Sequence, residues 1–171
     1  MDAYSVIRGL RATRHFQPRA LDPADLAAIL EAGRWTGSSK NVQGWQFVVF
    51  EDPADRERLA SAGAYTDPVR NAAAAIALVR TATGNDFDIG RAAQNLMLAA
   101  SSRGVASCPV TLHDSAAASA VLGLQPGEEC RYAVALGYAD ESAERQARDK
   151  RRASGAGGRR PADEVIRRTP K

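Results

Sequence analysis

Three basic side chains fall within five residues near the start of the chain, at Arg11, Arg14 and His15. They follow an apolar stripe at residues 6–10 that predicts a short helix ending near Arg11. Because arginine guanidinium groups bind phosphate oxygens bidentately, this segment is a candidate anion site. Cations at the end of a helix also offset its dipole, and that interpretation of the same residues stays open.

A second candidate segment covers residues 36–45. Its sequence, Thr-Gly-Ser-Ser-Lys-Asn-Val-Gln-Gly-Trp, gathers hydroxyls, amides and backbone N–H groups between a predicted helix end and a predicted strand. Such a loop is suited to a polar or planar ligand. Its composition alone also fits an ordinary connection.

No motif indicates chemistry carried by side chains alone. Residues 155–158 lack the spacing of a dinucleotide-binding turn, and the chain has no GxxxxGK phosphate loop. His15 and His113 have no nucleophile motif around them, and no carboxylate pair stands out. Cys108 and Cys130 have neither CxxC nor His spacing, which excludes a structural zinc site. We expect no catalytic side chain and no metal, so that in an enzyme a cofactor would carry the reaction.

Interleaved helices and strands must position these segments. Asp22-Pro23, Asp52-Pro53 and Asp67-Pro68 each place a helix cap before a proline at the first helical position, and Asp114 caps a further helix. Hydrophobic patterns predict long helices over residues 23–34 and 86–103, and strands over 45–51, 73–80, 105–111 and 130–138. The order is not a regular βαβ alternation, so we predict a layered α+β fold.

Composition favours one globular domain with a basic end. The chain has 171 residues, of which 44% are hydrophobic and 25% charged. Residues 1–144 contain 13 Lys and Arg against 17 Asp and Glu, whereas residues 145–171 contain 10 against 3. We therefore expect a body over residues 1–144 and a basic C-terminal arm of the same domain over residues 145–171.

The basic arm is open to several interpretations: a solvated tail, a nucleic-acid tether, a set of phosphate ligands or a strap across a partner subunit. The Gly-rich stretch at residues 155–158 predicts a flexible hinge, and the apolar pair Val165-Ile166 follows it. An apolar pair favours packing on a surface, most simply that of a second subunit. No apolar run reaches 18 residues and no secretory signal is visible, so we expect a cytoplasmic protein with no membrane contact.

Several segments, taken in order, resemble the FMN-dependent nitroreductase family. They are Arg-x-x-Arg-x-Phe at 11–16, Ser-x-x-Asn-x-Gln-x-Trp-x-Phe-Val-Val at 38–49, Asp-Ile-Gly-Arg-Ala-Ala-Gln-Asn-Leu-Met-Leu-Ala-Ala at 88–100, Gly-Val-Ala-Ser-Cys-Pro-Val at 104–110 and Arg-Arg-Pro-Ala-Asp-Glu-Val-Ile at 159–166. The resemblance implies a three-layer α+β fold, with a mixed, mostly antiparallel sheet flanked by helices. It also implies a homodimer in which the C-terminal arm extends over the partner subunit.

The resemblance further implies FMN as cofactor and NAD(P)H as co-substrate. Hydride would pass from NAD(P)H to FMN, and then to a nitroaromatic, quinone or similar small acceptor by a ping-pong mechanism. The protein would supply position and electrostatic field, because the cofactor carries the chemistry.

Positions matching the family's cofactor contacts form four groups. The phosphate and ribityl contacts match Arg11, Ala12, Thr13 and Arg14. A loop that reaches the flavin of the other subunit matches Ser38, Ser39, Asn41 and the nearby Gln43. The loop along the isoalloxazine, which offers backbone N–H groups to its N5 edge, matches Pro109, Val110, Thr111 and Leu112. The late phosphate-binding arginine matches Arg159, with Arg160 beside it.

Departures from the family pattern leave alternatives open. Gly37 and Gly44 replace common prolines, which predicts more mobile loops, and Ala12 replaces a common serine. Thr111-Leu112 stands where many members have Glu-Gly, and the insertion that often covers the pocket is missing. The alternatives are a relative with other flavin chemistry (dehydrogenation, dehalogenation or flavin fragmentation), a non-catalytic flavin-binding protein, or a deazaflavin in place of FMN. A nucleic-acid-binding module is the alternative from another class, although we expect no nucleic acid.

Overall fold

The computed structural model describes residues 2–154 and 158–169. Its contacts divide the chain into two compact units, Met1–Asp140 and Glu141–Lys171. The predicted boundary at residue 144 falls inside the first helix of the second unit, α7 (Glu141–Ala153). Whether the second unit is an arm of the same domain stays a prediction.

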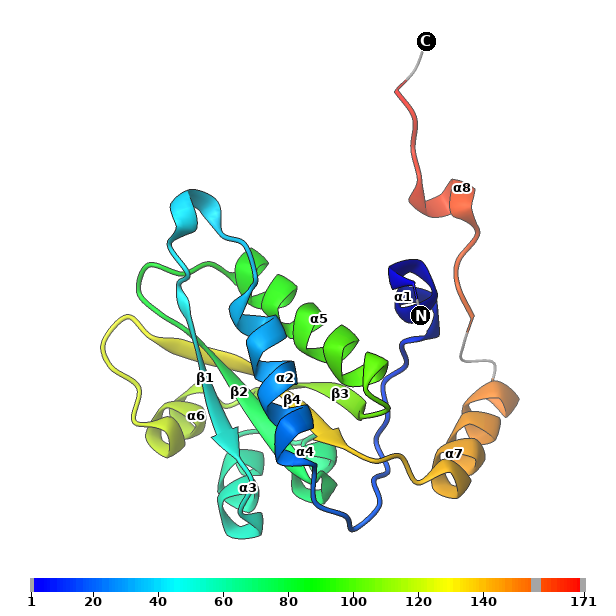
Figure 1. Ribbon diagram of the computed structural model, residues 1–171, viewed down its shortest axis with the longest axis horizontal. Helices are drawn as coiled ribbons and strands as arrows, with labels where there is room; N and C mark the ends of the chain where they lie inside the picture. The colour runs from blue at the N-terminus through cyan, green and yellow to red at the C-terminus, as the bar shows by residue number, and fades with distance from the viewer. Residues whose placement is uncertain (1, 155–157, 170–171) are drawn as a thin grey trace. The chain divides into compact units, whose positions relative to one another are not determined.

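A four-stranded antiparallel sheet forms the centre of the first unit (Figure 1). The strand order is β1 (Trp45–Phe50), β2 (Ala74–Arg80), β4 (Glu129–Gly137) and β3 (Ala106–Thr111), so β1 and β3 lie at opposite edges. Ala12 adds one parallel bridge to Ser107 beyond β3. The predicted α+β class and mostly antiparallel sheet are confirmed, and the parallel component is limited to that bridge.

Helices cover both faces of the sheet, which gives the predicted three layers. On one face lie α2 (Pro23–Arg34) and α5 (Asp86–Ser102), and on the other lie α3 (Pro53–Ala60), α4 (Asp67–Asn71) and α6 (Ser115–Leu122). The short α1 (Ala3–Gly9) contacts α5. Alternate residues of β2 enter the two cores: Ile76 and Leu78 pack with α2 and α5, whereas Ala77 and Val79 pack with α3, α4 and α6.

Most predicted helix starts are confirmed by their caps. The carboxylates of Asp22, Asp52 and Asp114 each accept a backbone N–H in the first turn of the helix that follows. The prediction for Asp67 is wrong, because α4 begins at Asp67 itself and its N-cap is Thr66.

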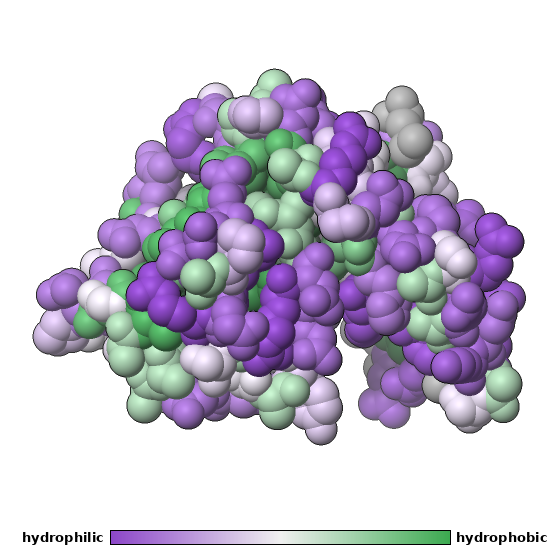
Figure 2. Space-filling view, turned by 90° about the horizontal axis from the view of Figure 1, so that it is seen from below, coloured by the Kyte–Doolittle hydropathy of each residue, from purple (hydrophilic) through white to green (hydrophobic). Residues whose placement is uncertain are grey.

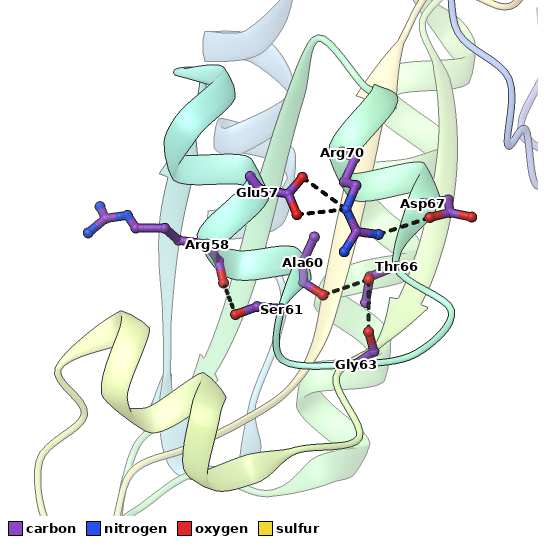
Figure 3. A network of polar contacts seen from close by, with 8 residues as sticks. All are labelled: Glu57, Arg58, Ala60, Ser61, Gly63, Thr66, Asp67 and Arg70. Atoms are coloured by element: carbon purple, nitrogen blue, oxygen red, sulfur yellow. Dashed lines mark hydrogen bonds and ion pairs between the residues drawn. The ribbon is translucent and has the colours of Figure 1, made fainter.

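Thr66 occupies the N-cap position of α4, but its hydroxyl makes no capping hydrogen bond because it binds the end of α3 instead. It is fully buried and donates to the carbonyl of Ala60 at 2.6 Å, which ties α4 to the end of α3 (Figure 3). Arg70 reinforces the same junction by binding Glu57 at 2.9 Å and Asp67 at 2.9 Å (Figure 3). These contacts hold the turn between α3 and α4 in place on its face of the sheet.

The second unit contains a helix that the sequence analysis described only as a charged segment. Residues Glu141–Ala153 form α7, and a single turn, α8 (Ala162–Val165), follows further along. Within α7, Arg151 lies 3.8 Å from the carboxylate of Glu144. Val165 and Ile166 are 58% and 63% exposed. The predicted hinge at residues 155–158 lies outside the described residues, except for Gly158.

Polar side chains dominate the face of the molecule seen in Figure 2, where apolar ones show between them. In the part of the chain that the structure describes, no helix is long and apolar enough to span a membrane. In the same residues, no group of three or more His, Cys, Asp and Glu side chains is arranged to hold a metal ion.

Both cysteines are buried thiols outside any disulfide. Burial raises the pKa of the Cys130 thiol to about 11. Because the thiolate is the reactive form, we expect Cys130 to react with DTNB at pH 8 only as fast as the protein unfolds. Thiol titration with and without denaturant, followed by peptide mapping, checks this. Rapid labelling of Cys130 in the native protein would contradict it.

Candidate functional site

The basic segment near the N-terminus lies alongside β3. Ala12 bridges to Ser107, and the Thr13 N–H donates to the carbonyl of Ser107 at 2.9 Å. Arg14 is exposed. Arg11 is also exposed, and its guanidinium donates to the carbonyl of Leu10 at 2.8 Å and to that of a residue in the last turn of α1 at 2.6 Å. Arg11 therefore satisfies the carboxyl end of α1, which is the second of the two interpretations given for this segment.

The register of β3 shows which backbone groups this strand leaves available. The Leu112 N–H donates to the carbonyl of Arg131 at 2.8 Å, so the backbone N–H of Leu112 points toward β4. In an antiparallel pair the direction of the backbone N–H alternates from one residue to the next. The N–H of Val110 therefore also points toward β4, whereas the backbone nitrogens of Pro109 and Thr111 point away from it. Proline has no N–H, and Leu112 is only 2% exposed. Three of the four predicted residues thus lie in β3 itself, and Thr111 is the one of the four whose N–H is directed away from the sheet.

The polar loop before β1 has an unusual backbone. It contains the single turn η1 (Ser39–Asn41), and Lys40, Asn41 and Gln43 have φ angles of 52°, 55° and 51°. Non-glycine residues adopt this left-handed conformation at a cost, which surrounding contacts must offset. One such contact is local: the Gln43 N–H donates to the Ser38 hydroxyl at 2.8 Å.

Three further contacts hold the ends of this loop. At the end next to α2, Arg91 of α5 donates to the carbonyl of Gly37 at 2.6 Å, and Asn95 donates to the Thr36 hydroxyl at 2.9 Å. At the other end Gly44 lies against Gly84, where a Cβ on Gly84 would be 2.0 Å from the carbonyl oxygen of Gly44. The buried Gly44 therefore provides room for a close backbone approach, which the sequence analysis did not anticipate.

The fold brings two of the candidate segments together and separates the third. Residues 11–14 and 109–112 both lie at the β3 edge of the sheet. Residues 38–43 precede β1, the opposite edge, three strand spacings or about 14 Å away. Figure 1 shows this loop in cyan at the end of the sheet where α5 begins. One copy of the chain therefore does not gather all the predicted contacts at one place.

The two candidate arginines of the second unit are exposed. Arg160 lies before α8 and pairs with Glu164 of that helix at 3.0 Å, and Arg159 precedes Arg160. Their place relative to the first unit stays a prediction.

Large apolar side chains lie in the polar loop and beside it. Trp35, Val42 and Phe87 are 75%, 47% and 76% exposed. The Trp35 ring is nevertheless held in position, because its indole N–H donates to the Glu31 carboxylate at 2.6 Å. Hydrogen bonds from Arg34 and then Trp35 hold the pKa of Glu31 at about 2. A fixed, exposed tryptophan is typical of a surface that binds another molecule.

Sequence reasoning did not assign the residues that shape this loop. Asp88, Arg91 and Asn95 lie in a segment that carried the family resemblance, but they were given no role. The sequence pattern indicated that these residues lie in one helix. It gave no sign of their contacts with Thr36 and Gly37, which lie more than fifty residues earlier. The sequence around Gly84 indicated only that a glycine precedes Asn85, the N-cap of α5.

Comparison with known proteins identifies the family. The family model described as "Nitroreductase family" matches residues 7–82 and 65–138. Together these ranges span most of the chain, including the whole sheet. The chain belongs to the nitroreductase family.

Individual relatives are more distant. The chain is 27% identical over 88 residues to a curated protein of Bacillus subtilis (strain 168) named "Putative NAD(P)H nitroreductase YdgI", and the match covers 50% of this chain and 42% of that protein. The chain thus spans less than half the length of this relative.

Two solved structures share the fold over nearly the whole chain. A protein from Desulfovibrio desulfuricans in complex with FMN is 25% identical with a TM-score of 0.82, covering 100% of this chain and 99% of its own. The NADPH:FMN oxidoreductase of Vibrio harveyi, complexed with NAD+, is 21% identical with a TM-score of 0.83, covering 98% of this chain and 77% of its own.

Proposed function

We propose that this protein is an FMN-dependent oxidoreductase that takes hydride from NAD(P)H and passes it to a nitroaromatic, a quinone or a similar small acceptor. The observation that carries the proposal is the family match across the first unit. It is supported by the basic segment at residues 11–14 lying beside the outward-facing backbone of β3. The solved relatives that contain FMN or NAD+ support the choice of cofactor and co-substrate.

The groups at the β3 edge suit such a cofactor. Arg14 is an exposed cation within reach of the same strand and would bind a phosphate, with the backbone of Ala12 and Thr13 beside it. Arg11 uses Nη1 at the end of α1, and the other nitrogens of its guanidinium would donate to the same phosphate. The Thr111 N–H would donate to the edge of the flavin ring, and Pro109 and Val110 would lie along it. When bound, FMN supplies the capacity to accept and return hydride. The side chains bind and orient it and stabilise the negative charge of its reduced form.

We further propose that the protein acts as a homodimer. The loop with Ser38, Ser39, Asn41 and Gln43 would contact the flavin of the second copy, since the sheet separates it from residues 11–14. The exposed Trp35 and its apolar neighbours beside that loop would then be covered. Arg159, Arg160 and the exposed apolar pair Val165-Ile166 would belong to an arm that binds the partner. The cytoplasm remains the proposed location.

One observation favours the alternative of a different flavin chemistry. Because Leu112 is buried and its N–H is bound to Arg131, Thr111 is the one residue among the described residues 109–112 whose backbone N–H is directed away from β4. Fewer donors at the ring edge change how readily a reduced flavin gives up hydride. A member that binds FMN yet reduces nitroaromatics slowly fits this arrangement.

The absorbance spectrum of the purified protein tests the main proposal. We expect a flavin spectrum with one FMN per chain after reconstitution, and bleaching in anaerobic stopped-flow on mixing with NADH or NADPH. Reoxidation by a nitroaromatic or a quinone would complete the cycle. Bleaching without reoxidation by either acceptor would favour the alternative chemistry, and failure to bind FMN at all would contradict both.

Replacing Arg14 by alanine is expected to weaken FMN binding by about tenfold or more, because a charge-assisted hydrogen bond to phosphate contributes about 1.5–3 kcal/mol. Riboflavin lacks the phosphate, so its affinity should change little. Fluorescence titration of both ligands measures this. Arg58→Ala, in α3 and in a surface pair with Asp55, makes the same change in charge and should leave both affinities unchanged. Equal loss for FMN and riboflavin would show that Arg14 does not bind the phosphate.

A further inference from the structure

The first turn of α5 contains a buried carboxylate that the proposed chemistry does not use. Asp88 is only 6% exposed. One of its oxygens accepts from the Asn85 side-chain amide at 2.8 Å, and the other lies 3.4 Å from a guanidinium nitrogen of Arg91. Burying a carboxylate is costly unless its partners compensate, so this arrangement requires an explanation.

Arg91 connects this carboxylate to the polar loop. The nitrogen atom that lies 3.4 Å from Asp88 also donates to the carbonyl of Gly37 at 2.6 Å. A Cβ at Gly37 would lie 3.2 Å from the other terminal nitrogen of Arg91, so the guanidinium is packed closely against the loop backbone. Asp88, Arg91 and the Gly37 carbonyl thus form a continuous series of polar contacts, from the first turn of α5 to the start of the loop.

The loop needs such support because of its backbone. Lys40, Asn41 and Gln43 are all in the left-handed region, and a loop of this kind relaxes unless its ends are held. The Gly44–Gly84 contact fixes the end next to β1, whereas Arg91 and Asn95 fix the end next to α2. The same loop carries the residues proposed to serve the second copy's flavin.

We propose that Asp88 is a positioning residue, which orients Arg91 so that Arg91 holds the Gly37 carbonyl and keeps residues 38–43 in the conformation that contacts the flavin of the second copy. The part concerning flavin rests on the proposed function. The part concerning the loop stands on the contacts within one chain.

A purely local role for Asp88 is the competing explanation. Its N–H donates to the Asn85 side-chain oxygen at 2.9 Å, so Asp88 also takes part in capping α5. If capping were its whole role, Arg91 would have no influence on the loop. The effects of replacing Asp88 and Arg91 would then differ in kind.

The few lysines in the sequence provide a way to measure how often the loop leaves its observed conformation. The sequence has three lysines, of which Lys40 lies in the loop, Lys150 lies in α7 and Lys171 is the last residue. Within these 171 residues, a lysine-specific endoprotease therefore has two internal cleavage sites, after Lys40 and after Lys150. Cleavage requires an extended backbone, so its rate at Lys40 measures how often the loop leaves the observed conformation. Cleavage at Lys150 serves as the internal reference.

We expect Asp88→Asn and Arg91→Met each to increase the Lys40 cleavage rate, relative to Lys150, by about tenfold, since each removes a charged hydrogen-bond partner. The double variant should be no faster than Arg91→Met alone, because the two residues act in series. Asp25→Asn is the matched control: it breaks the 2.6 Å pair between Arg103, at the other end of α5, and α2. It should leave the ratio unchanged.

Acceleration by Asp88→Asn without acceleration by Arg91→Met would overturn the proposal and leave only the capping role. Strictly additive effects in the double variant would also overturn it. These measurements need no FMN, so they are independent of the proposed function.

Flavin affinity then tests the second part of the proposal. In the uncleaved 171-residue protein we expect both variants to bind FMN about fivefold more weakly at a temperature where they are fully folded, with Asp25→Asn unchanged. Faster loop cleavage with an unchanged FMN dissociation constant would disprove the link to the flavin. Failure of the wild-type protein to bind FMN would instead refute the proposed function and leave the loop result intact.

Discussion

A single methyl group at Gly84 is expected to destabilise the protein by about 3 kcal/mol, at the upper end of the cost of overpacking. The Cβ of an alanine there would lie 2.0 Å from the Gly44 carbonyl oxygen, and Gly44 cannot retreat because its carbonyl accepts the Thr81 N–H at 3.1 Å. Since the overlap is with backbone, no change of rotamer relieves it. Urea unfolding followed by circular dichroism should show a lower midpoint with a similar slope.

Gly90→Ala is the matched control for this prediction. Gly90 lies inside α5, and a Cβ there would meet nothing within 4 Å. Alanine reduces the entropy of the unfolded chain and favours helix, so this variant should gain about 0.5–1 kcal/mol. If Gly84→Ala lowers the free energy of unfolding and Gly90→Ala raises it, the close backbone approach accounts for the loss of stability at Gly84, and the general effect of replacing a glycine does not. A Gly84→Ala variant as stable as wild type would show that the Gly44–Gly84 contact is not required.

Mixing two variants that each bind FMN weakly is expected to restore flavin binding if the polar loop serves the partner's site. Arg14→Ala removes the phosphate contact of a chain's own site, and Asn41→Ala removes the contribution to the partner's site. In a mixed dimer one of the two sites then has both residues. Random exchange of subunits makes half of the dimers mixed, so about a quarter of wild-type occupancy should return. Flavin absorbance after unfolding and refolding the mixture measures this.

A second mixture controls for non-specific rescue. Arg11→Ala and Arg14→Ala both lie on the same side of the proposed site, so their mixed dimers contain no intact site and should recover nothing. Native mass spectrometry must show that mixed dimers form in both cases. Recovery in neither mixture, with mixed dimers present, would place Asn41 and Arg14 in the same chain's site or outside it.

The sequence predicted the layers of this fold because their signals are local. The Asp22 and Asp52 caps, the apolar run of β2 and the αL glycine at Gly123 each depend on a few neighbouring residues. Helix α7 escaped prediction because it lacks an apolar stripe, with alanine as its main uncharged residue. The cap at Asp67 was wrong because Thr66 is directed toward the end of α3.

The candidate site was only partly accessible to sequence reasoning. Residue types at 11–14 and 38–43 indicated polar binding, and the resemblance supplied their roles. The direction of the Thr111 N–H depends on strand register, which no local pattern gives. The restraint on Gly37 depends on Arg91, which is distant in the chain. Contacts of this kind are set by the folded arrangement, so the structure was needed to find them.

The order of the strands has a consequence for how quickly this chain reaches its native state. The central pair joins Ala77 of β2 to Ala133 of β4, more than fifty residues later, and β1 can join the sheet only through β2. Closing so long a segment costs entropy before any contact compensates for it. High contact order of this kind slows folding, so pairing of β2 with β4 should dominate the kinetic barrier of the first unit. Until that pairing forms, both apolar faces of β2 are uncovered, which makes this strand the segment most prone to association between nascent chains.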